Sequence, residues 1–280
     1  MINKKYYKYR QPHRLRKKRS VLRNRYFWFS ALFLLFLGGT LYLVCFSNFF
    51  QVKEVKIVGN QKTPLAEIQK TIDKGVGQKV LAFFDSNSIF LANLGEITRD
   101  LLEEFPQISS ATVNRQLPDK LLVEIKERLP FGVWCQALLS FPSENLGGQG
   151  ENCFYLDRTG VIFDDNPVAD ILVIKTQNQP AEVVLGERII ANDFMEKIAK
   201  VQKTLKDNLE INIKEFNIIS SDRLNARTQE GWEIYFDPAG NLDWQLTEVK
   251  AVLEKQIPSE KRGNLEYIDL RFSKVYYKYR

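Results

Sequence analysis

The 280-residue sequence is poor in histidine and cysteine, with one histidine, His13, and three cysteines. Because His13 lies near the N-terminus, the remaining chain lacks the residue on which Ser-His-Asp and Cys-His catalysis depends and which most often binds metals. A phosphate-binding loop is also missing, because residues 147–150 (GGQG) are followed neither by Lys-Ser/Thr nor by a predicted helix. The sequence therefore predicts a protein that is not an enzyme and that holds no metal and no cofactor.

Acidic residues are absent from residues 1–25, which contain eleven Lys or Arg. The remainder has 29 basic and 34 acidic residues, so the basic pI of about 9.0 is a property of this tail alone. A cluster of bases directly before an apolar run is typical of a membrane helix whose N-terminus stays in the cytoplasm. The bases that we predict to set this topology are Arg16, Lys17, Lys18, Arg19, Arg23 and Arg25.

Residues 26–50 contain no charged side chain and are long enough to cross a bilayer. As a helix they rise ~37 Å, against ~30 Å for a hydrocarbon core. A cleaved secretory signal is the alternative, but its apolar part spans only ~7–15 residues and ends at small residues, whereas this run ends at Phe49-Phe50. A lipoprotein site at Cys45 is disfavoured because Val44 precedes it. We expect an uncleaved single-pass anchor with residues 51–280 outside the cytoplasm.

Two roles fit the basic tail, residues 1–25. It can act only as the topology determinant, adsorbing loosely to anionic lipid of the inner leaflet. Its interleaved tyrosines can instead hold a cytoplasmic partner or nucleic acid. Because the first role is sufficient, we expect contact with membrane lipid and no binding of nucleic acid.

Cys135 and Cys153 lie on the predicted outer side of the membrane, where disulfides form. They flank residues 136–152, which are rich in Gly, Ser, Pro and Asn. This arrangement predicts a disulfide at the base of a long hairpin loop, and the alternative is two unpaired thiols. A zinc site is disfavoured because His13 lies on the other side of the membrane.

Residues 51–128 are predicted to form one compact domain with the order strand, helix, helix, strand, strand. Alternating residues around 54–57 indicate the first strand. Thr63-Pro64 offers a helix start before the apolar positions of the first helix, and the second helix is expected at about 87–105. The remaining strands are expected at 111–115 and 121–125, and the buried stripe of the second helix is expected to comprise Leu91, Leu94, Leu101, Leu102 and Phe105.

Residues 129–280 are predicted to form a β-rich domain with two helices, at 192–206 and 243–256. Two of its strands are joined by Asp157-Arg158-Thr159-Gly160, a sequence typical of a tight hairpin turn. The strands expected from short apolar runs are 131–135, 153–156, 161–163, 171–174, 216–219, 224–228, 232–236, 265–272 and 275–279.

The last of these strands is predicted to be an edge strand that another chain can extend. Polar and apolar residues alternate over 267–272, so we expect Ile268, Leu270 and Phe272 on a buried face. The segment 275–279 is aromatic and β-favouring, which makes an uncovered edge a template for strand addition. An edge protected by its basic residues is the alternative. The predicted partner-binding residues are Tyr267, Asp269, Arg271, Val275, Tyr276, Tyr277 and Tyr279.

These segments together resemble the bacterial cell division family FtsQ/DivIB, over nearly the whole chain. Residues 52–60 (VKEVKIVGN) resemble the opening strand of its POTRA domain, and residues 105–113, 117–121 and 124–130 (FPQISSATV, LPDKL and EIKERLP) resemble the closing strands and exit. Residues 155–163 (YLDRTGVIF) and 267–272 (YIDLRF) are similar to a hairpin and the last strands of its β domain. The departures are the 135–153 insert and a chain that ends soon after the last strand.

The resemblance implies an α+β protein with a basic tail (1–25), a membrane helix (26–50), a POTRA domain (51–128) and a β domain (129–280). It implies no catalysis but a scaffold in the bacterial plasma membrane at the division septum. This scaffold would link cytoplasmic division proteins to septal wall synthesis. The family's β domain binds membrane-anchored coiled-coil partners, FtsB and FtsL, with FtsB pairing along the last strand. Its POTRA domain binds further division proteins.

Two other classes of function are the alternatives. A membrane-anchored envelope enzyme is disfavoured by the missing histidine and cofactor loops. A POTRA protein that handles polypeptides at a membrane is disfavoured because such domains usually repeat before a barrel, and no barrel pattern follows here.

Overall fold

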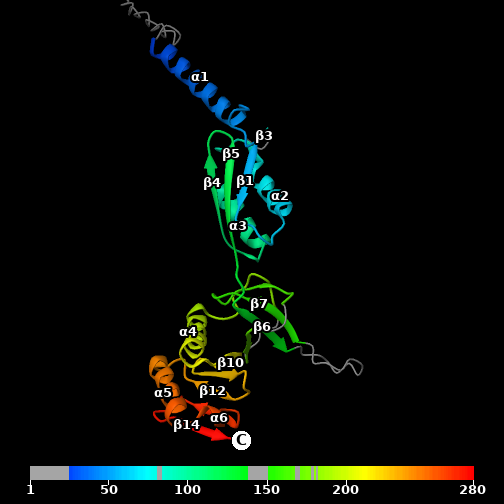
Figure 1. The fold of residues 1–280 in the computed structure, drawn as a ribbon. Coiled ribbons are helices and arrows are strands. Elements are labelled where there is room, and N and C mark those ends of the chain that lie inside the picture. The colour runs from blue at the N-terminus through cyan, green and yellow to red at the C-terminus, as the bar shows by residue number, and fades with distance from the viewer. Residues whose placement is uncertain (1–24, 81–83, 138–150, 168–170, 178–179, 181) are drawn as a thin grey trace, which may run out of the picture.

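The computed structural model describes residues 25–80, 84–137, 151–167, 171–177, 180 and 182–280. Figure 1 shows a long N-terminal helix, then a small domain of helices and strands, then a larger sheet domain that carries the C-terminus at its far end. The chain is therefore a single N-terminal helix followed by two α+β units.

Helix α1 (Arg25–Phe46) is the one helix in the described part of the chain that is long and apolar enough to cross a membrane. None of its residues is buried against the protein, which fits a transmembrane anchor surrounded by lipid. Arg25 begins the helix, and its guanidinium lies 5.3 Å from the ring centre of Tyr26. The other predicted topology residues, Arg16, Lys17, Lys18, Arg19 and Arg23, lie outside the described residues.

The first domain packs two helices against a three-stranded sheet. The sheet has the order β1-β5-β4, with β1 (Glu54–Val58) parallel to β5 (Lys120–Glu127) and β4 (Ile108–Gln116) antiparallel to it. Helices α2 (Leu65–Val76) and α3 (Leu94–Glu104) contribute Ile68, Ile72, Ile97 and Leu101 to one core with the sheet. The predicted order is confirmed, with a short hairpin of β2 (Gln78–Val80) and β3 (Phe84–Ser86) added between the helices.

The start predicted for the second helix is wrong by seven residues, because α3 begins at Leu94 rather than near Asn87. The side chain of Asn93 accepts a hydrogen bond from the backbone N–H of Glu96 at 3.3 Å and so caps the helix. Leu91 therefore precedes α3, and Leu102 is 38% exposed, so both lie outside the buried stripe, to which Ile97 belongs.

The expected cap of the first helix is also different from the prediction. The side chain of Thr63 does not cap α2, which begins after Pro64. Instead, the carboxylate of Glu127 on β5 accepts hydrogen bonds from the backbone N–H groups of Gln61, Lys62 and Thr63 at 2.8–3.0 Å. These bonds outweigh the effect of burial and lower the pKa of Glu127. A distant strand residue therefore stabilises this turn.

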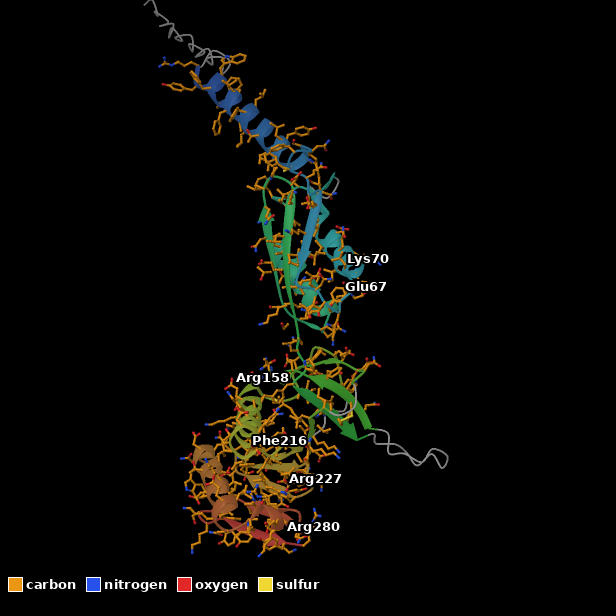
Figure 2. All side chains as sticks on the ribbon, in the orientation of Figure 1. Glu67, Lys70, Arg158, Phe216, Arg227 and Arg280 are labelled. Carbon is orange, nitrogen blue, oxygen red and sulfur yellow. A yellow bond between two sulfur atoms is a disulfide. The ribbon has the colours of Figure 1, made fainter. Side chains whose placement is uncertain are left out.

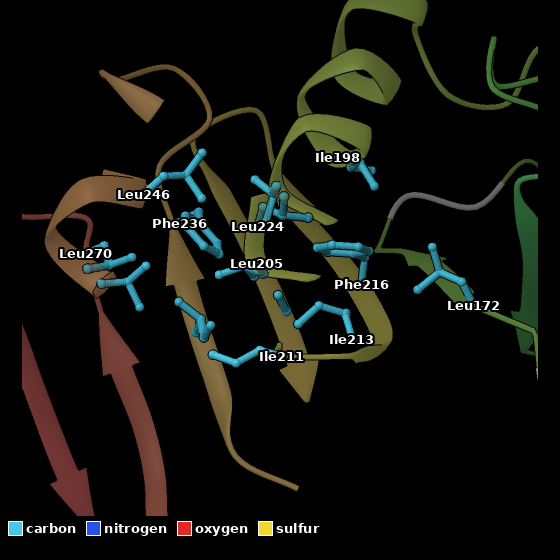
Figure 3. Packing of buried hydrophobic residues seen from close by; sticks show 14 of the residues in the cluster. Leu172, Ile198, Leu205, Ile211, Ile213, Phe216, Leu224, Phe236, Leu246 and Leu270 are labelled. Atoms are coloured by element: carbon cyan, nitrogen blue, oxygen red, sulfur yellow. The ribbon is translucent and has the colours of Figure 1, made fainter. Parts of the chain in front are cut away.

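The second domain is built on a nine-stranded sheet with the order β14-β13-β12-β11-β10-β9-β6-β7-β8. Its helices α4 (Asn192–Leu209) and α5 (Leu242–Lys255) pack against one face (Figure 1), and a short helix α6 (Ser259–Arg262) follows. Figure 3 shows Ile198 of α4 above Phe216 of the sheet, with Leu205 of α4 next to Leu224 in the same cluster. The strands are β6 (Gly132–Ala137), β7 (Glu151–Leu156), β8 (Ile162–Asp164), β9 (Val173–Thr176), β10 (Ile213–Ser220), β11 (Arg223–Thr228), β12 (Glu233–Phe236), β13 (Leu265–Asp269) and β14 (Tyr276–Tyr279).

Cys135 and Cys153 are directly opposite each other on β6 and β7 and form a disulfide with an S–S distance of 2.08 Å. The bond closes the hairpin whose loop includes residues 138–150, which lie outside the described residues. Cys135 is buried on the face of the sheet away from the helices, in a small cluster with Val133, Tyr155 and Phe163.

We expect the Cys135→Ser/Cys153→Ser double variant to unfold at a lower denaturant concentration than the parent. The two cysteines are 18 residues apart. For a loop of this length, loss of the disulfide is expected to lower the free energy of unfolding by ~3 kcal/mol, because the unfolded chain gains conformational entropy. Chemical denaturation of the oxidised chain and the double variant measures the difference. Reduced parent protein is the control, and it should match the double variant if the bond itself is responsible.

Candidate interaction surface

Strand β14 forms one edge of the nine-stranded sheet among the strands that the structure describes. It pairs antiparallel with β13, with Ile268 opposite Tyr277 and Asp269 opposite Tyr276. None of its four residues is buried, and the side chain of Tyr276 is 54% exposed. A strand that is paired on one side only leaves backbone N–H and C=O groups on its other side for a second chain.

The two faces of β14 differ in character because cross-strand neighbours share a face. Tyr277 stands in one row with Ile268 and Ile234, which are buried beneath the helices. This row extends the core outward to the sheet edge. Tyr276 stands instead in the row of Asp269 and Tyr235, on the face that the helices leave open.

The open face next to the edge carries stacked aromatic rings and arginines. The rings of Tyr235 and Tyr267 stack with their centres 5.1 Å apart. The guanidinium groups of Arg223 and Arg271 lie 5.4 and 5.5 Å from the ring centre of Tyr235, within cation–π range. Burial and the neighbouring Glu233 raise the pKa of Tyr235, so the phenol stays neutral. Tyrosine and arginine are the residue types enriched at interface hot spots.

The predicted division of 267–272 into a polar and a buried face is wrong at two positions. Asp269 is only 6% exposed, whereas Phe272 is 54% exposed. The strand ends at Asp269, whose carboxylate accepts hydrogen bonds from the backbone N–H of Arg271 at 3.1 Å and from its guanidinium at 2.9 and 2.6 Å. These contacts turn the chain, so that Phe272 points outward and packs its ring against Tyr276. Asp269 therefore positions Arg271 rather than facing solvent.

Two basic residues of the edge, Lys278 and Arg280, form contacts within the chain. Lys278 forms an ion pair with Glu266 at 2.6 Å. The backbone N–H of Arg280 donates to the carbonyl of Asn264 at 2.9 Å, and its guanidinium donates to the carbonyl of Gly231 at 2.7 Å. Arg280 lies at the end of the sheet domain farthest from α1 (Figure 2). The backbone pairing with β13 and the contacts of Arg280 hold β14 in place within the chain.

A shallow hollow of about 440 Å³ lies beside the end of β13. It is lined on one side by the start of α5, including Trp244, and on the other by Arg271 and Phe272. The hollow borders the aromatic surface of the edge through Phe272, whose ring packs against Tyr276. Among the described residues, no group of His, Cys, Asp and Glu could hold a metal ion.

Sequence reasoning selected the residues of β13 and β14 but missed Arg223, Tyr235 and Trp244. The alternation of Ile234, Tyr235 and Phe236 marks Tyr235 as a residue of the open face. The alternation does not predict the order of strands in the sheet. In the structure, β12 lies next to β13 and is parallel to it. That pairing brings Arg223 and Tyr235 beside the C-terminal edge, whereas Trp244 reaches it from the start of α5.

Comparison with known proteins gives two matches that follow one another along the chain. Residues 50–128 match the family model described as "POTRA domain, FtsQ-type". Residues 148–271 match the model described as "Cell division protein FtsQ/DivIB, C-terminal".

Three curated proteins are similar to this chain. Cell division protein DivIB of Clostridium tetani is 24% identical over 251 residues, which cover 86% of this chain and 83% of that protein. Cell division protein FtsQ of Bradyrhizobium diazoefficiens is 26% identical over 185 residues, or 65% of this chain and 46% of that protein. FtsQ of Syntrophotalea carbinolica is 27% identical over 165 residues, or 55% of this chain and 50% of that protein. The match thus spans about half the length of the last two relatives.

Proposed function

Because the chain belongs to the FtsQ/DivIB family of cell division proteins, we propose that it is a non-enzymatic scaffold that binds its partners through β14. The observation that carries the proposal is the edge strand β14, open on one side and bordered by tyrosines and arginines. Strand addition uses backbone hydrogen bonds for affinity and neighbouring side chains for specificity, and this edge offers both.

The family resemblance suggests the class of partner, and the open edge of β14 supports strand addition as the mode of binding. We propose that β14 receives a strand from a membrane-anchored coiled-coil protein of the FtsB/FtsL type. The POTRA domain, for which we propose the limits 51–128, would bind further division proteins, and the β domain would occupy 129–280. The scaffold would lie in the bacterial plasma membrane at the division septum, with its N-terminus in the cytoplasm.

The test is the affinity of the full chain, in nanodiscs, for the extracytoplasmic part of its own FtsB-type protein. Replacing Tyr276 with alanine is expected to weaken binding about 30-fold, since truncating an aromatic anchor costs ~2 kcal/mol or more. Deleting residues 275–280 removes the paired strand and is expected to abolish binding. Isothermal calorimetry or surface plasmon resonance gives the dissociation constants.

Leu65→Ala is the matched control, because Leu65 is similarly exposed but lies at the start of α2 in the other domain. It should bind like the parent. Tryptophan fluorescence checks that the truncated chain remains folded, since Trp134 and Trp232 are fully buried in the second domain. If the folded Tyr276→Ala and deletion variants both retain parental affinity, β14 is not the binding site.

A further inference from the structure

The membrane helix α1 is joined to the first domain by hydrogen bonds at its exposed carbonyl end. The last carbonyls of a helix have no partner within the helix. Here the hydroxyl of Ser88 donates to the carbonyl of Val44 at 2.7 Å, and the hydroxyl of Ser86 donates to the carbonyl of Cys45. Both serines are almost completely buried. The end of α1 is therefore capped by side chains of the domain that follows it.

The segment between α1 and β1 is also held by backbone contacts. The N–H of Ile89 donates to the carbonyl of Phe50 at 2.8 Å, and the N–H of Val52 donates to the carbonyl of Asn87 at 3.0 Å. The ring of Phe50 packs edge-on against Phe90 with centres 5.2 Å apart. These contacts leave the connection little freedom, so the domain has a defined orientation relative to α1.

Three large apolar side chains are exposed at this end of the first domain. Phe49 is 60% exposed, Phe90 43% and Leu117 62%. We call these three residues the juxtamembrane rim. Leu117 begins the turn between β4 and β5, which Figure 1 shows at the end of the domain nearest α1. The guanidinium of Arg115 ties this turn to the Phe90 loop by donating to the carbonyls of Ile89 at 2.6 Å and Ala92 at 2.7 Å.

We propose that the juxtamembrane rim is seated in the interfacial layer of the lipid leaflet from which α1 emerges, so that the first domain rests on the bilayer in a fixed orientation. The inference rests on α1 crossing the membrane. Phe49 lies three residues beyond the end of α1 at Phe46, a reach of at most ~10 Å. The interfacial layer extends ~5–8 Å beyond the hydrocarbon core. With Phe46 at the boundary of the hydrocarbon core, Phe49 lies in or at this layer, and Phe90 lies beside it because it packs against the neighbouring Phe50.

The chemistry of the rim favours lipid rather than a charged partner. Two ion pairs lie next to the rim, Lys53 with Asp119 at 3.3 Å and Lys120 with Glu54 at 2.5 Å. The guanidinium of Arg115 is turned to the backbone carbonyls of Ile89 and Ala92. The rim itself is aromatic and aliphatic, and such side chains partition into the interface through buried apolar area. Contact with the bilayer should therefore not require anionic lipid.

Photocrosslinking of the full chain in nanodiscs of neutral phosphatidylcholine tests this seating without any division partner. p-Benzoylphenylalanine replaces Phe90 or Leu117, and the same residue at position 49 is the positive control. Position 65 is the negative control, because the exposure of Leu65, 51%, is between those of Phe90 and Leu117, and Leu65 begins α2, which follows the end of β1 that is farther from α1 along the chain. We expect lipid adducts at positions 90 and 117 several-fold above position 65 and near the level of position 49. Adducts at 90 and 117 no higher than at position 65 would overturn the proposal.

The same experiment in the Ser86→Ala/Ser88→Ala variant tests whether the capped junction orients the domain. Loss of both caps is expected to lower the yield of lipid adducts at positions 90 and 117 several-fold. The yield at position 49 should not change, because α1 still holds this position at the membrane. Unchanged adducts at all three positions would show that the serines do not orient the domain. Nanodiscs that contain anionic lipid should give the same yields, and a rise limited to those discs would indicate charge-driven adsorption instead.

Discussion

Replacing Asp157 with alanine is expected to destabilise the second domain by about 3–5 kcal/mol, the range found when one partner of a buried ion pair is removed. Asp157 is the first residue of the Asp157-Arg158-Thr159-Gly160 turn and is almost completely buried. Its carboxylate pairs with the guanidinium of Arg128 at 2.5 Å, and the Arg128 side chain is itself only 16% exposed. Removing the carboxylate leaves this guanidinium without its counter-charge.

The carboxylate of Asp157 also holds its own turn. One oxygen accepts hydrogen bonds from the backbone N–H and the hydroxyl of Thr159, each at 2.8 Å, and from the N–H of Val161 at 3.1 Å. Arg128 in turn donates from its side chain to the carbonyl of Pro106 at 3.0 Å and from its backbone to that of Gln107 at 2.7 Å. The Arg128–Asp157 pair thus links the end of the first domain to a turn of the second.

Equilibrium unfolding followed by tryptophan fluorescence measures this effect in the correct domain. Trp134, Trp232 and Trp244 all lie in the second domain, whereas the first domain contains no tryptophan and Trp28 lies in α1. Glu266→Ala is the matched control, since it removes the ion pair with Lys278, which is equally short at 2.6 Å but exposed to solvent. Ion pairs that are exposed to solvent contribute little to the stability of the folded state. This variant should therefore unfold at the same denaturant concentration as the parent. An Asp157→Ala variant as stable as Glu266→Ala would contradict the prediction.

The free energy of unfolding of the parent should decrease in acid, as expected when a carboxylate is held in its charged form in the folded state. Burial alone would raise the pKa of Asp157, but hydrogen bonds from Val161, Thr159 and Arg128 outweigh it and lower the pKa below its ordinary value of 3.8. Such a group adds stability above its unfolded pKa, and this stability is lost as the pH falls through the folded pKa. The gap between parent and Asp157→Ala should therefore be constant near neutral pH and shrink below about pH 4.

The sequence predicted elements whose signal is local and missed features that depend on distant contacts. Helices α4 and α5 lie within a few residues of the predicted limits because their apolar residues recur at helical spacing. The start of α3 was missed because the segment before it pairs with Gln51 and caps α1 through Ser88, contacts with residues more than thirty positions away. No periodicity in the segment itself encodes these contacts.

In the candidate site, too, features with a local signal in the residue pattern were predicted, and features without one, including those that depend on distant contacts, were missed. Strand β14 was predictable because residues 275–279 are aromatic and β-favouring. The burial of Asp269 and the exposure of Phe272 were not, because both follow from one local bond network that ends the strand. The contribution of Tyr235 depended on the order of strands in the sheet, which alternation does not encode. Side-chain alternation therefore predicted the faces of residues within the strands, but neither the end of β13 nor the order of strands in the sheet.

Replacing Gly160 with alanine is expected to destabilise the second domain by about 4 kcal/mol or more, at the upper end of single substitutions. Gly160 has φ +84°, a conformation that residues with a Cβ rarely adopt. A Cβ at this position would lie 2.0 Å from the carbonyl oxygen of Ile190 and 2.9 Å from its carbonyl carbon. Because these are backbone atoms, the 189–190 segment would have to move, which would break the bonds that Ile189 and Ile190 donate to the Gly160 carbonyl.

Two further variants separate the causes of this effect. Gly263→Ala is the matched control, because Gly263 has φ −62° and no atom within 4 Å of an added Cβ; it should stabilise the chain by about 0.5 kcal/mol through the unfolded state. Asparagine adopts positive φ more readily than alanine, but it has the same Cβ. The Gly160→Asn variant should therefore be nearly as unstable as Gly160→Ala. Parental stability in Gly160→Asn would mean that backbone conformation, not the approach of Ile190, requires the glycine. That result would remove the steric argument while keeping the turn assignment, because the hydrogen bonds of Asp157 to Thr159 and Val161 do not depend on the Cβ.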